Sequence, residues 1–243
     1  MTDDGKRRWG GPEKEAQKNA PKNSRSLTEH VHPKKVRTQS SRAWLERQLN
    51  DPYVKRAKAE GFRARAAFKL IELDEKFHLL KRGARVIDLG AAPGGWAQVA
   101  LKRGAKAVVG IDLLHIDRLT GATFFEMDFL DPAAAPRILA ALGGPPDIVL
   151  SDMAANATGH ARTDQIKTGA LAEAAADFAL ATLGPGGVFV TKAFLGGLDA
   201  ALLTRLKQHF THVRHAKPPA SRAASSEVYV VATGFKANVG EGA

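Results

Sequence analysis

Apolar and polar positions follow two different periods along the chain from about Arg85 onward. Short apolar runs such as 86–89 and 148–150 are typical of strands buried on both faces. Longer stretches between them have the spacing of amphipathic helices. This alternation predicts an α/β fold built on a doubly wound, mostly parallel sheet of seven strands. The predicted strands are 85–89, 107–112, 122–126, 147–151, 187–193, 212–216 and 227–234, and the helices between them are 94–103, 133–142, 164–182 and 197–209.

Three more helices are predicted before this sheet. Ser41 can cap the first, which runs to Leu49. Asp51-Pro52 is a typical helix start, with Asp as the N-cap and Pro in the first turn, and Gly61 ends this second helix. The third covers about 66–79 and carries an apolar stripe.

The ends of the chain differ from its middle. Up to Gln39 there are few large apolar side chains and no clear period, which predicts a disordered arm that cannot bury enough surface to fold. The predicted organisation is therefore a basic N-terminal extension over 1–40, one domain over 41–236 and a short tail over 237–243.

Composition narrows the class of protein. The 243 residues are 44% apolar, which suits one sizeable core, and they include no cysteine. Disulfides, thiolate metal sites and cysteine nucleophiles are thereby excluded. No secretory leader is visible, and no apolar run approaches the roughly 20 residues of a membrane span. We expect a cytoplasmic protein that has no membrane partner.

Net charge points to a polyanionic partner. The formal charge is +11, which favours nucleic acid or an acidic membrane surface. Residues 1–42 hold eleven Lys and Arg against five acidic residues, so much of this charge lies in the predicted arm. An arm that follows phosphates is the functional interpretation, and a solubilising tail is the alternative.

Glycines follow the first predicted strand. Ligands of doubly wound sheets bind beyond the carboxyl ends of the strands. The first strand continues into Asp88-Leu89-Gly90-Ala91-Ala92-Pro93-Gly94-Gly95-Trp96, where glycines let the backbone approach a ligand and the next helix offers free N–H groups. Ala92 replaces the second glycine of the dinucleotide fingerprint, so a nicotinamide-dependent dehydrogenase is the weakest alternative.

Acidic residues mark the next three strand ends. Asp112 ends the second strand, where an acid suits the two hydroxyls of a ribose. Asp128 and Phe129 follow the third and could bond an adenine amino group and stack on its ring. Asp152 follows the fourth. One such acid is often only a helix cap, but the set predicts an adenosine-containing ligand such as S-adenosylmethionine.

Three further charged residues stand near these strand ends. Lys192 ends the fifth strand, and a lysine inside an apolar run needs a partner or a function. Glu227 opens the last strand. Lys69 lies on the third helix beside Phe68, and taken alone it is better explained as a surface lysine whose stem packs on apolar neighbours.

Four segments together resemble the FtsJ/RrmJ family of ribosomal RNA large subunit methyltransferases, the methyltransferase E family. They are Arg63–Leu70, Asp88–Trp96, Ser151–Ala154, and Ser221-Arg222-Ala223 with Glu227-Val228-Tyr229. The resemblance runs from about Ser41 to Phe235 and implies a Rossmann-like class I methyltransferase fold. It also implies methyl transfer from S-adenosylmethionine, leaving S-adenosylhomocysteine, to the 2′-hydroxyl of a uridine in the aminoacyl-tRNA-binding loop of large-subunit (23S) RNA.

The resemblance also assigns roles to residues. The family's catalytic set falls on Lys69, Asp152, Lys192 and Glu227, and its cofactor contacts fall on Gly94, Trp96, Asp112, Asp128 and Asp152. With the strand-end analysis, the predicted cofactor site is Asp88, Gly90, Gly94, Gly95, Trp96, Asp112, Asp128, Phe129 and Asp152, with no metal. The chain departs from the family at Ala155, where Pro is frequent, and at Ser226, where Arg is frequent; these changes could alter the RNA-facing loop or the surroundings of Glu227.

Lys192 is the expected general base or the group that steers the hydroxyl, while Lys69 and Glu227 hold the nucleotide. The expected phosphate contacts are Arg42, Lys55, Arg56, Arg63 and Arg65. The expected partner is large-subunit ribosomal RNA within the assembled subunit, bound by a monomer. Two alternatives stay open: a 2′-O-methyltransferase of transfer RNA or of a messenger cap, and a non-catalytic RNA-binding ribosome-assembly factor on the same fold.

Overall fold

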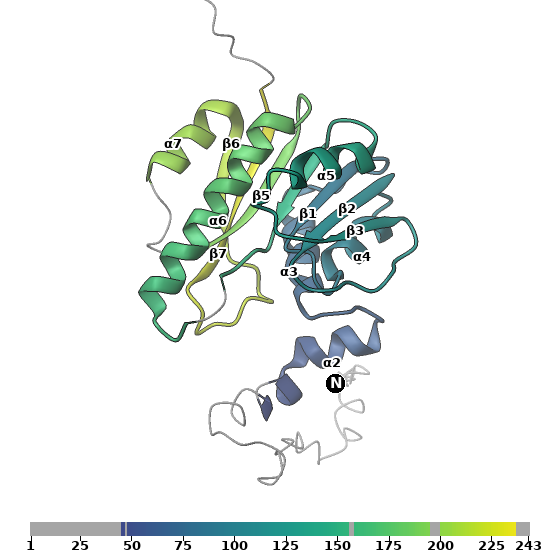
Figure 1. Cartoon of the computed structure of the whole chain (residues 1–243). Coiled ribbons are helices and arrows are strands. Elements are labelled where there is room, and N and C mark those ends of the chain that lie inside the picture. The colour runs from purple at the N-terminus through teal and green to yellow at the C-terminus, as the bar shows by residue number, and fades with distance from the viewer. Residues whose placement is uncertain (1–44, 47, 156–157, 195–199, 237–243) are drawn as a thin grey trace, which may run out of the picture. The chain divides into compact units, whose positions relative to one another are not determined.

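The computed structural model of the chain describes residues 45–46, 48–155, 158–194 and 200–236. The predicted arm and tail lie outside these residues, as does Arg42. The chain divides after Asn50 into two units, and the described residues of the first are helical, inside or one residue beyond the predicted helix 41–49. The second unit contains every element labelled in Figure 1.

The described part of the second unit alternates strands and helices as predicted. The helices are α2 (Pro52–Ala59), α3 (Ala66–Phe77), α4 (Gly95–Lys102), α5 (Ala134–Leu142), α6 (Ala161–Thr182) and α7 (Ala200–His209). The strands are β1 (Arg85–Leu89), β2 (Ala107–Asp112), β3 (Ala122–Glu126), β4 (Ile148–Ser151), β5 (Val188–Phe194), β6 (Phe210–Ala216) and β7 (Glu227–Phe235).

All seven strands form one sheet in the order β3-β2-β1-β4-β5-β7-β6. The pairs among β1 to β5 are parallel, whereas β7 runs antiparallel to both β5 and β6. The prediction of a mostly parallel seven-stranded sheet is confirmed. Because β7 is reversed, its first residue lies at the same edge of the sheet as the last residues of β1 to β5.

Helices cover both faces of the sheet, as predicted (Figure 1). On one face, Ile87 of β1 and Val149 of β4 belong to a core completed by α5, α6 and α7. On the other face, Val86 belongs to a core completed by α3 and α4. Neighbouring strand residues point to opposite faces, so strands that are apolar along their whole length fill both cores at once.

The helix α2 starts as its sequence predicts. The side chain of Asp51 accepts a hydrogen bond from the N–H of Tyr53, and Pro52 occupies the first turn. A small cluster of Ala57, Phe68 and Ala220 then packs α2 against α3 and the loop before β7. No helix of the described residues is both long enough and apolar enough to cross a membrane.

Candidate active site

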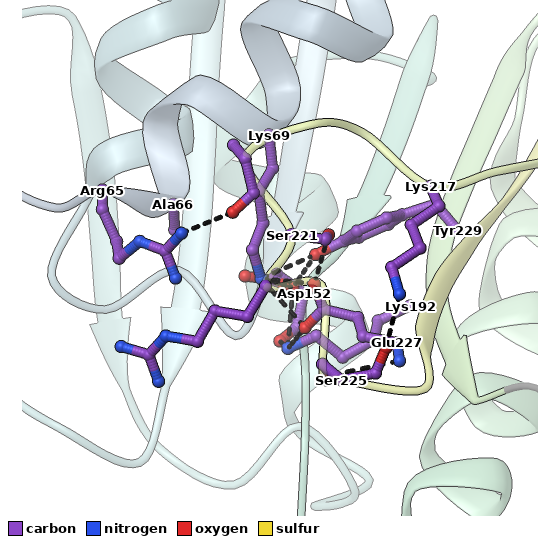
Figure 2. A network of polar contacts seen from close by, with 12 residues as sticks. Arg65, Ala66, Lys69, Asp152, Lys192, Lys217, Ser221, Ser225, Glu227 and Tyr229 are labelled. Carbon is purple, nitrogen blue, oxygen red and sulfur yellow. Dashed lines mark hydrogen bonds and ion pairs between the residues drawn. The ribbon is translucent and has the colours of Figure 1, made fainter. Parts of the chain in front are cut away.

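Four charged side chains from separate parts of the chain meet at the carboxyl edge of the sheet (Figure 2). Lys69 comes from α3, Asp152 follows β4, Lys192 lies on β5 and Glu227 begins β7. Lys192 Nζ is 2.7 Å from Asp152 Oδ1, and Lys69 Nζ is 2.8 Å from Glu227 Oε1. The crossed pairs are also near, at 4.0 Å for Lys69–Asp152 and 3.8 Å for Lys192–Glu227. The structure thus brings the predicted catalytic set together as one tetrad.

Burial makes each charge of the tetrad depend on the others. The four side chains are only 9% to 15% exposed, and a buried charge without a partner is strongly destabilising. Burial by itself would raise the pKa of Asp152. The ammonium groups of Lys192 and Lys69, with hydrogen bonds from Lys192 and Tyr229, outweigh that effect and hold the pKa of Asp152 below its ordinary value.

Lys192 is fixed by two contacts to one residue. Its Nζ approaches the Asp152 carboxylate and also donates to the backbone carbonyl of Asp152 at 2.8 Å. A lysine ammonium has three N–H donors. The position of the amino group is therefore set to within a narrow range, which is what a group acting on a substrate hydroxyl requires.

Tyr229 joins the two halves of the tetrad, and the sequence analysis gave it no role. Its hydroxyl donates to Asp152 Oδ1 at 2.6 Å and accepts from Lys69 Nζ at 3.2 Å. Burial, and then the charges of Asp152 and Glu227, raise the pKa of Tyr229 well above its ordinary value, so it stays protonated. Strand alternation places it on the same face as Glu227, two residues earlier, and that was the available signal.

Ser221 is a second residue without a predicted role. Its hydroxyl donates to Glu227 Oε1 at 2.7 Å. Both backbone groups of the preceding residue, Ala220, are bonded. Its N–H donates to Glu72 Oε2 at 2.6 Å, and its carbonyl accepts from Arg65 Nη2 at 2.5 Å. The loop before β7 is thereby fixed to α3, and nothing local in the sequence shows this pairing across about 150 residues.

A cleft of about 360 Å³ lies beside the tetrad, at the carboxyl ends of β1 to β4. Five of the residues predicted to bind a cofactor line it: Gly90, Asp112, Asp128, Phe129 and Asp152. Asp152 is thus common to the cleft and the tetrad. This is the edge where ligands of doubly wound sheets bind.

Asp88, at the end of β1, is buried and lacks a full set of partners. It is 1% exposed, and its Oδ2 has no hydrogen-bond partner among the described residues. Burial, followed by the nearby charge of Asp152, raises the pKa of Asp88 to about 8. Buried acceptors without a partner are rare in folded proteins. Asp88 does not line the cleft, although Gly90, two residues later, does.

The turn at Gly90 explains why glycine is needed there. Its φ is +77°, and a Cβ at this position would lie 2.8 Å from Met153 Cγ and 3.0 Å from the Met153 backbone. A side chain would therefore push apart the loops after β1 and β4, which both line the cleft.

The acids of the cleft also hold its loops. Asp112 accepts from the N–H groups of Ala92 and Leu114, both at 2.9 Å, and Asp128 accepts from Leu130 N–H at 2.9 Å. This bonding is not capping of a described helix: the contacts to Leu114 and Leu130 are local turn contacts, and the contact to Ala92 spans 20 positions. It does not exclude a ligand, because a carboxylate has about four lone-pair sites.

Gly94, Gly95 and Trp96 do not line the cleft. The Trp96 ring is 3% exposed, donates from Nε1 to the carbonyl of Ala66 at 2.8 Å, and lies 5.7 Å from the Tyr229 ring centroid. Its side chain is part of the core under the tetrad. A contact of Trp96 with a ligand would have to use its backbone at the start of α4.

Two of the predicted RNA contacts are engaged inside the protein. The Arg63 guanidinium donates to the carbonyls of Pro93, Asp117 and Arg118 at 3.1, 2.8 and 2.7 Å. Arg65 bonds Ala220 and lies 3.1 Å from Asp51 Oδ2. Both fix loops around the site in the structure.

The remaining described candidates lie on α2. The Arg56 guanidinium sits 4.3 Å from the centroid of the Phe68 ring and pairs with Glu60 at 2.6 Å, while Lys55 is exposed. Arg56 is itself exposed, so it keeps a surface that RNA could contact. Among the described residues, no group of three or more His, Asp or Glu side chains is arranged to hold a metal ion.

The fold and the site together define a class. A seven-stranded sheet with one reversed strand, and an acid-lined cleft at the carboxyl ends of β1 to β4, are the features of a Rossmann-like methyltransferase. The model of the FtsJ-like methyltransferase family matches residues 62–235, and the chain belongs to this family. The resemblance seen in the sequence is confirmed.

Similar proteins that carry a name are also methyltransferases. The protein named ribosomal RNA large subunit methyltransferase E from Sphingopyxis alaskensis is 61% identical over 210 residues, which cover 85% of this chain and 91% of the relative. The protein of the same name from Hyphomonas neptunium is 52% identical over 236 residues, covering 97% and 100%. A solved structure of a Plasmodium falciparum ribosomal RNA methyltransferase has a TM-score of 0.64 and 30% identity, and covers 72% of this chain and 98% of its own. The chain is therefore a methyltransferase.

Proposed function

We propose that this chain transfers the methyl group of S-adenosylmethionine to the 2′-hydroxyl of a uridine ribose in large-subunit ribosomal RNA. The observation that carries the proposal is the double role of Asp152, which lines the cleft and belongs to the tetrad. A methyl donor in the cleft and a hydroxyl at the tetrad would meet beside this residue. The names of the relatives support ribosomal RNA as the substrate.

The cleft residues fit S-adenosylmethionine. Gly90 lines the cleft at the turn after β1, where a residue without a side chain lets the backbone approach the methionine part. Asp112 would bind the ribose hydroxyls, and Asp128 with Phe129 the adenine; all three line the cleft. When bound, S-adenosylmethionine supplies a methyl group already activated by its sulfonium. The protein therefore has to position the acceptor and take one proton.

Lys192 is the residue that would take this proton. In the transfer, the methyl–sulfur bond breaks, a bond to the ribose oxygen forms, and the hydroxyl proton passes to Lys192 Nζ, after this ammonium group has released one of its own protons to solvent. Asp152 stays ionised because of the two lysines, and it holds Nζ in place. Lys69 and Glu227, fixed to each other at 2.8 Å, would hold the nucleotide.

Two substitutions of Lys192 test this assignment. General-base catalysis contributes about 10²- to 10⁴-fold, so we expect Lys192→Ala to lose at least about 10²-fold in turnover. Lys192→Arg keeps the charge but cannot act as a base, because its guanidinium stays protonated. We therefore expect it to be as inactive as Lys192→Ala. Methyl transfer to large subunits and binding of S-adenosylmethionine are measured for both.

Exposed Lys106 on the opposite edge of the sheet provides the control, as Lys106→Ala should leave both readouts unchanged. Wild-type turnover in Lys192→Ala would remove Lys192 from the reaction. Substantial turnover in Lys192→Arg would show that Lys192 only steers the hydroxyl by its charge.

The alternative substrates separate in the same assay. A tRNA or cap methyltransferase would label those RNAs and leave large subunits unlabelled. A non-catalytic assembly factor would bind RNA without label on any of them, but it would have no need for four buried charges arranged as a tetrad. We further propose that the chain acts as a monomer on the assembled subunit in the cytoplasm, and that the N-terminal arm, Arg42, Lys55 and Arg56 contact phosphates.

A further inference from the structure

A second cluster of cations lies along β6, the outer strand of the sheet. Lys76 at the end of α3, Lys207 on α7 and Arg214 on β6 line one hollow of about 610 Å³. Phe77, Val213 and His215 complete its lining. All three cations are exposed. We name this hollow the edge groove.

The cations of the edge groove have no anionic partner inside the protein. Among the described residues, Lys76, Lys207 and Arg214 make no ion pair and no side-chain hydrogen bond. Lys76 only approaches the ring of its neighbour Phe77, with Nζ 5.3 Å from the centroid. Arg56 on α2, by contrast, is exposed but paired with Glu60 at 2.6 Å. The charge of the edge groove is therefore available to an external anion.

The groove wraps around the edge of the sheet. Arg214 is paired with Val231, which belongs to the core on the α3 and α4 side, and cross-strand neighbours share a face. Val213 is paired with Ala232, which belongs to the core on the α6 and α7 side. Cations thus reach the edge strand from both sides, an arrangement that suits a narrow anionic chain.

The groove is on the same sheet as the tetrad and close to it. Ala216 of β6 is paired with Tyr229, which is paired with Lys192. Strands are about 4.8 Å apart and rise about 3.3 Å per residue. Since Arg214 is two residues before Ala216, its backbone lies about 12 Å from that of Lys192 in the plane of the sheet. One RNA segment could reach both.

We propose that the edge groove binds the phosphate backbone of the substrate RNA, away from the nucleotide that is methylated. The proposal rests on the proposed function for the kind of RNA. Cations on an edge strand can also serve only to prevent sheets from pairing edge to edge. That explanation covers Arg214, but Lys76 and Lys207 stand on helices, where no such protection is needed.

The test is the salt dependence of RNA binding by the full chain. The probe is protein-free large-subunit ribosomal RNA, and the variant carries Lys76→Gln, Lys207→Gln and Arg214→Gln. Each phosphate contact contributes roughly 0.7 to the slope of log affinity against log salt for single strands, so we expect the slope to fall by about 2. Affinity at a fixed moderate salt concentration should fall at least about 10-fold.

A matched variant removes the same net charge at the amino ends of β1 and β2. Lys81, Arg82 and Lys106 are exposed and precede β1 or β2, and changing all three to Gln should alter the slope far less. Equal slopes in the two triple variants would overturn the proposal, since only net charge would then matter. Unchanged binding to free RNA with weaker binding to assembled subunits would also overturn it, because the groove would then contact a ribosomal protein.

The same experiment separates this proposal from the proposed function. Lys192→Ala should keep the wild-type slope while losing methyl transfer. If the wild-type chain methylates no large-subunit RNA but the groove variant still loses slope, the proposed function fails and the groove stands as an RNA-binding surface.

Discussion

The pKa values of two buried aspartates at the carboxyl edge of the sheet are shifted in opposite directions by their surroundings. Asp152 has two lysines beside it, and its pKa lies below its ordinary value. Asp88 makes no ion pair with any of the described residues, and burial raises its pKa to about 8. The difference is that Asp152 belongs to a network of ion pairs, whereas Asp88 is buried beside another negative charge.

The raised pKa of Asp88 has a consequence for stability without ligand. A carboxyl whose pKa is higher in the folded state than in the unfolded one stabilises most below its unfolded pKa, and loses this contribution as pH rises through the folded value. We therefore expect the free energy of unfolding to fall between about pH 4 and the value of about 8, by one to a few kcal/mol. Urea denaturation over this range measures it.

Asp88→Asn removes the titrating group and should flatten that fall. Asp117→Asn is the control, because its side chain is 91% exposed and should not change the pH profile. A profile for Asp88→Asn that parallels the wild-type profile would contradict the assignment. The acid limb belongs to other groups: Asp152, whose pKa is lowered, stabilises at higher pH and loses its effect as pH falls.

At the residue scale, the sequence identified the charged residues of the site but not the residues that hold them in position. Lys192 and Asp152 stand out as charges next to apolar strands, which is a local signal. Tyr229 looks like a core aromatic until its partners Lys69 and Asp152 are known. Arg63 reads as an exposed cation, yet it donates to the carbonyls of Asp117 and Arg118, more than 50 positions away. Hydrogen-bond partners this far apart in the chain cannot be identified from a local sequence pattern.

At the scale of elements, residues of α2, α3 and their flanking turns hold the loop between β6 and β7 in place. Glu72 on α3 accepts from Ala220 N–H at 2.6 Å and from Tyr53 OH at 2.8 Å. Asp51 lies 3.1 Å from Arg65 and 3.7 Å from Arg222 of the loop. The helices before the sheet therefore support Glu227 through Ser221, in addition to supplying Lys69.

This support predicts that Glu72 is a positioning residue. Glu72→Ala should reduce turnover about 10-fold, toward the 10²-fold that a misplacement of about 1 Å can cause. Binding of S-adenosylmethionine should not change, and stability should fall by about 2 kcal/mol. Glu72→Gln should recover most of the turnover, because its oxygen can accept from Ala220 while its amide donates to the Tyr53 hydroxyl. Steady-state kinetics of the three proteins measures this.

Glu60 provides the matched control on α2. Its ion pair with Arg56 is exposed, so Glu60→Ala should have little effect on turnover or stability. Wild-type turnover in Glu72→Ala, together with the expected loss of stability, would show that the loop serves folding alone.

The elements themselves were predictable because they are short and strongly patterned. The third predicted helix ended two residues late, since His78 leaves the helix in the left-handed region with φ 53°. The predicted start of the last strand, Glu227, agrees with β7. Its insertion between β5 and β6 could not be read from the chain, because strand order depends on contacts between segments.

At the scale of the whole molecule, the net charge of +11 and the position of the site are both consistent with the proposed action on RNA. The buried tetrad and the cleft share Asp152, so the methyl donor and the RNA hydroxyl of the proposed reaction would meet beside this residue. The edge groove adds exposed cations in the same sheet, with the backbone of Arg214 about 12 Å from that of Lys192. The predicted division into arm, domain and tail at 1–40, 41–236 and 237–243 stays a prediction.

The most direct test of the central claim is methyl transfer from labelled S-adenosylmethionine to large ribosomal subunits that lack their own modification, followed by mapping of the labelled nucleotide. We predict label on the 2′-oxygen of one uridine in the tRNA-binding loop, and a rate of labelling at least about 10²-fold lower when Lys192→Ala replaces the wild-type chain. Label on a base, on transfer RNA alone, or on no RNA despite clear binding of S-adenosylmethionine would contradict the proposed function.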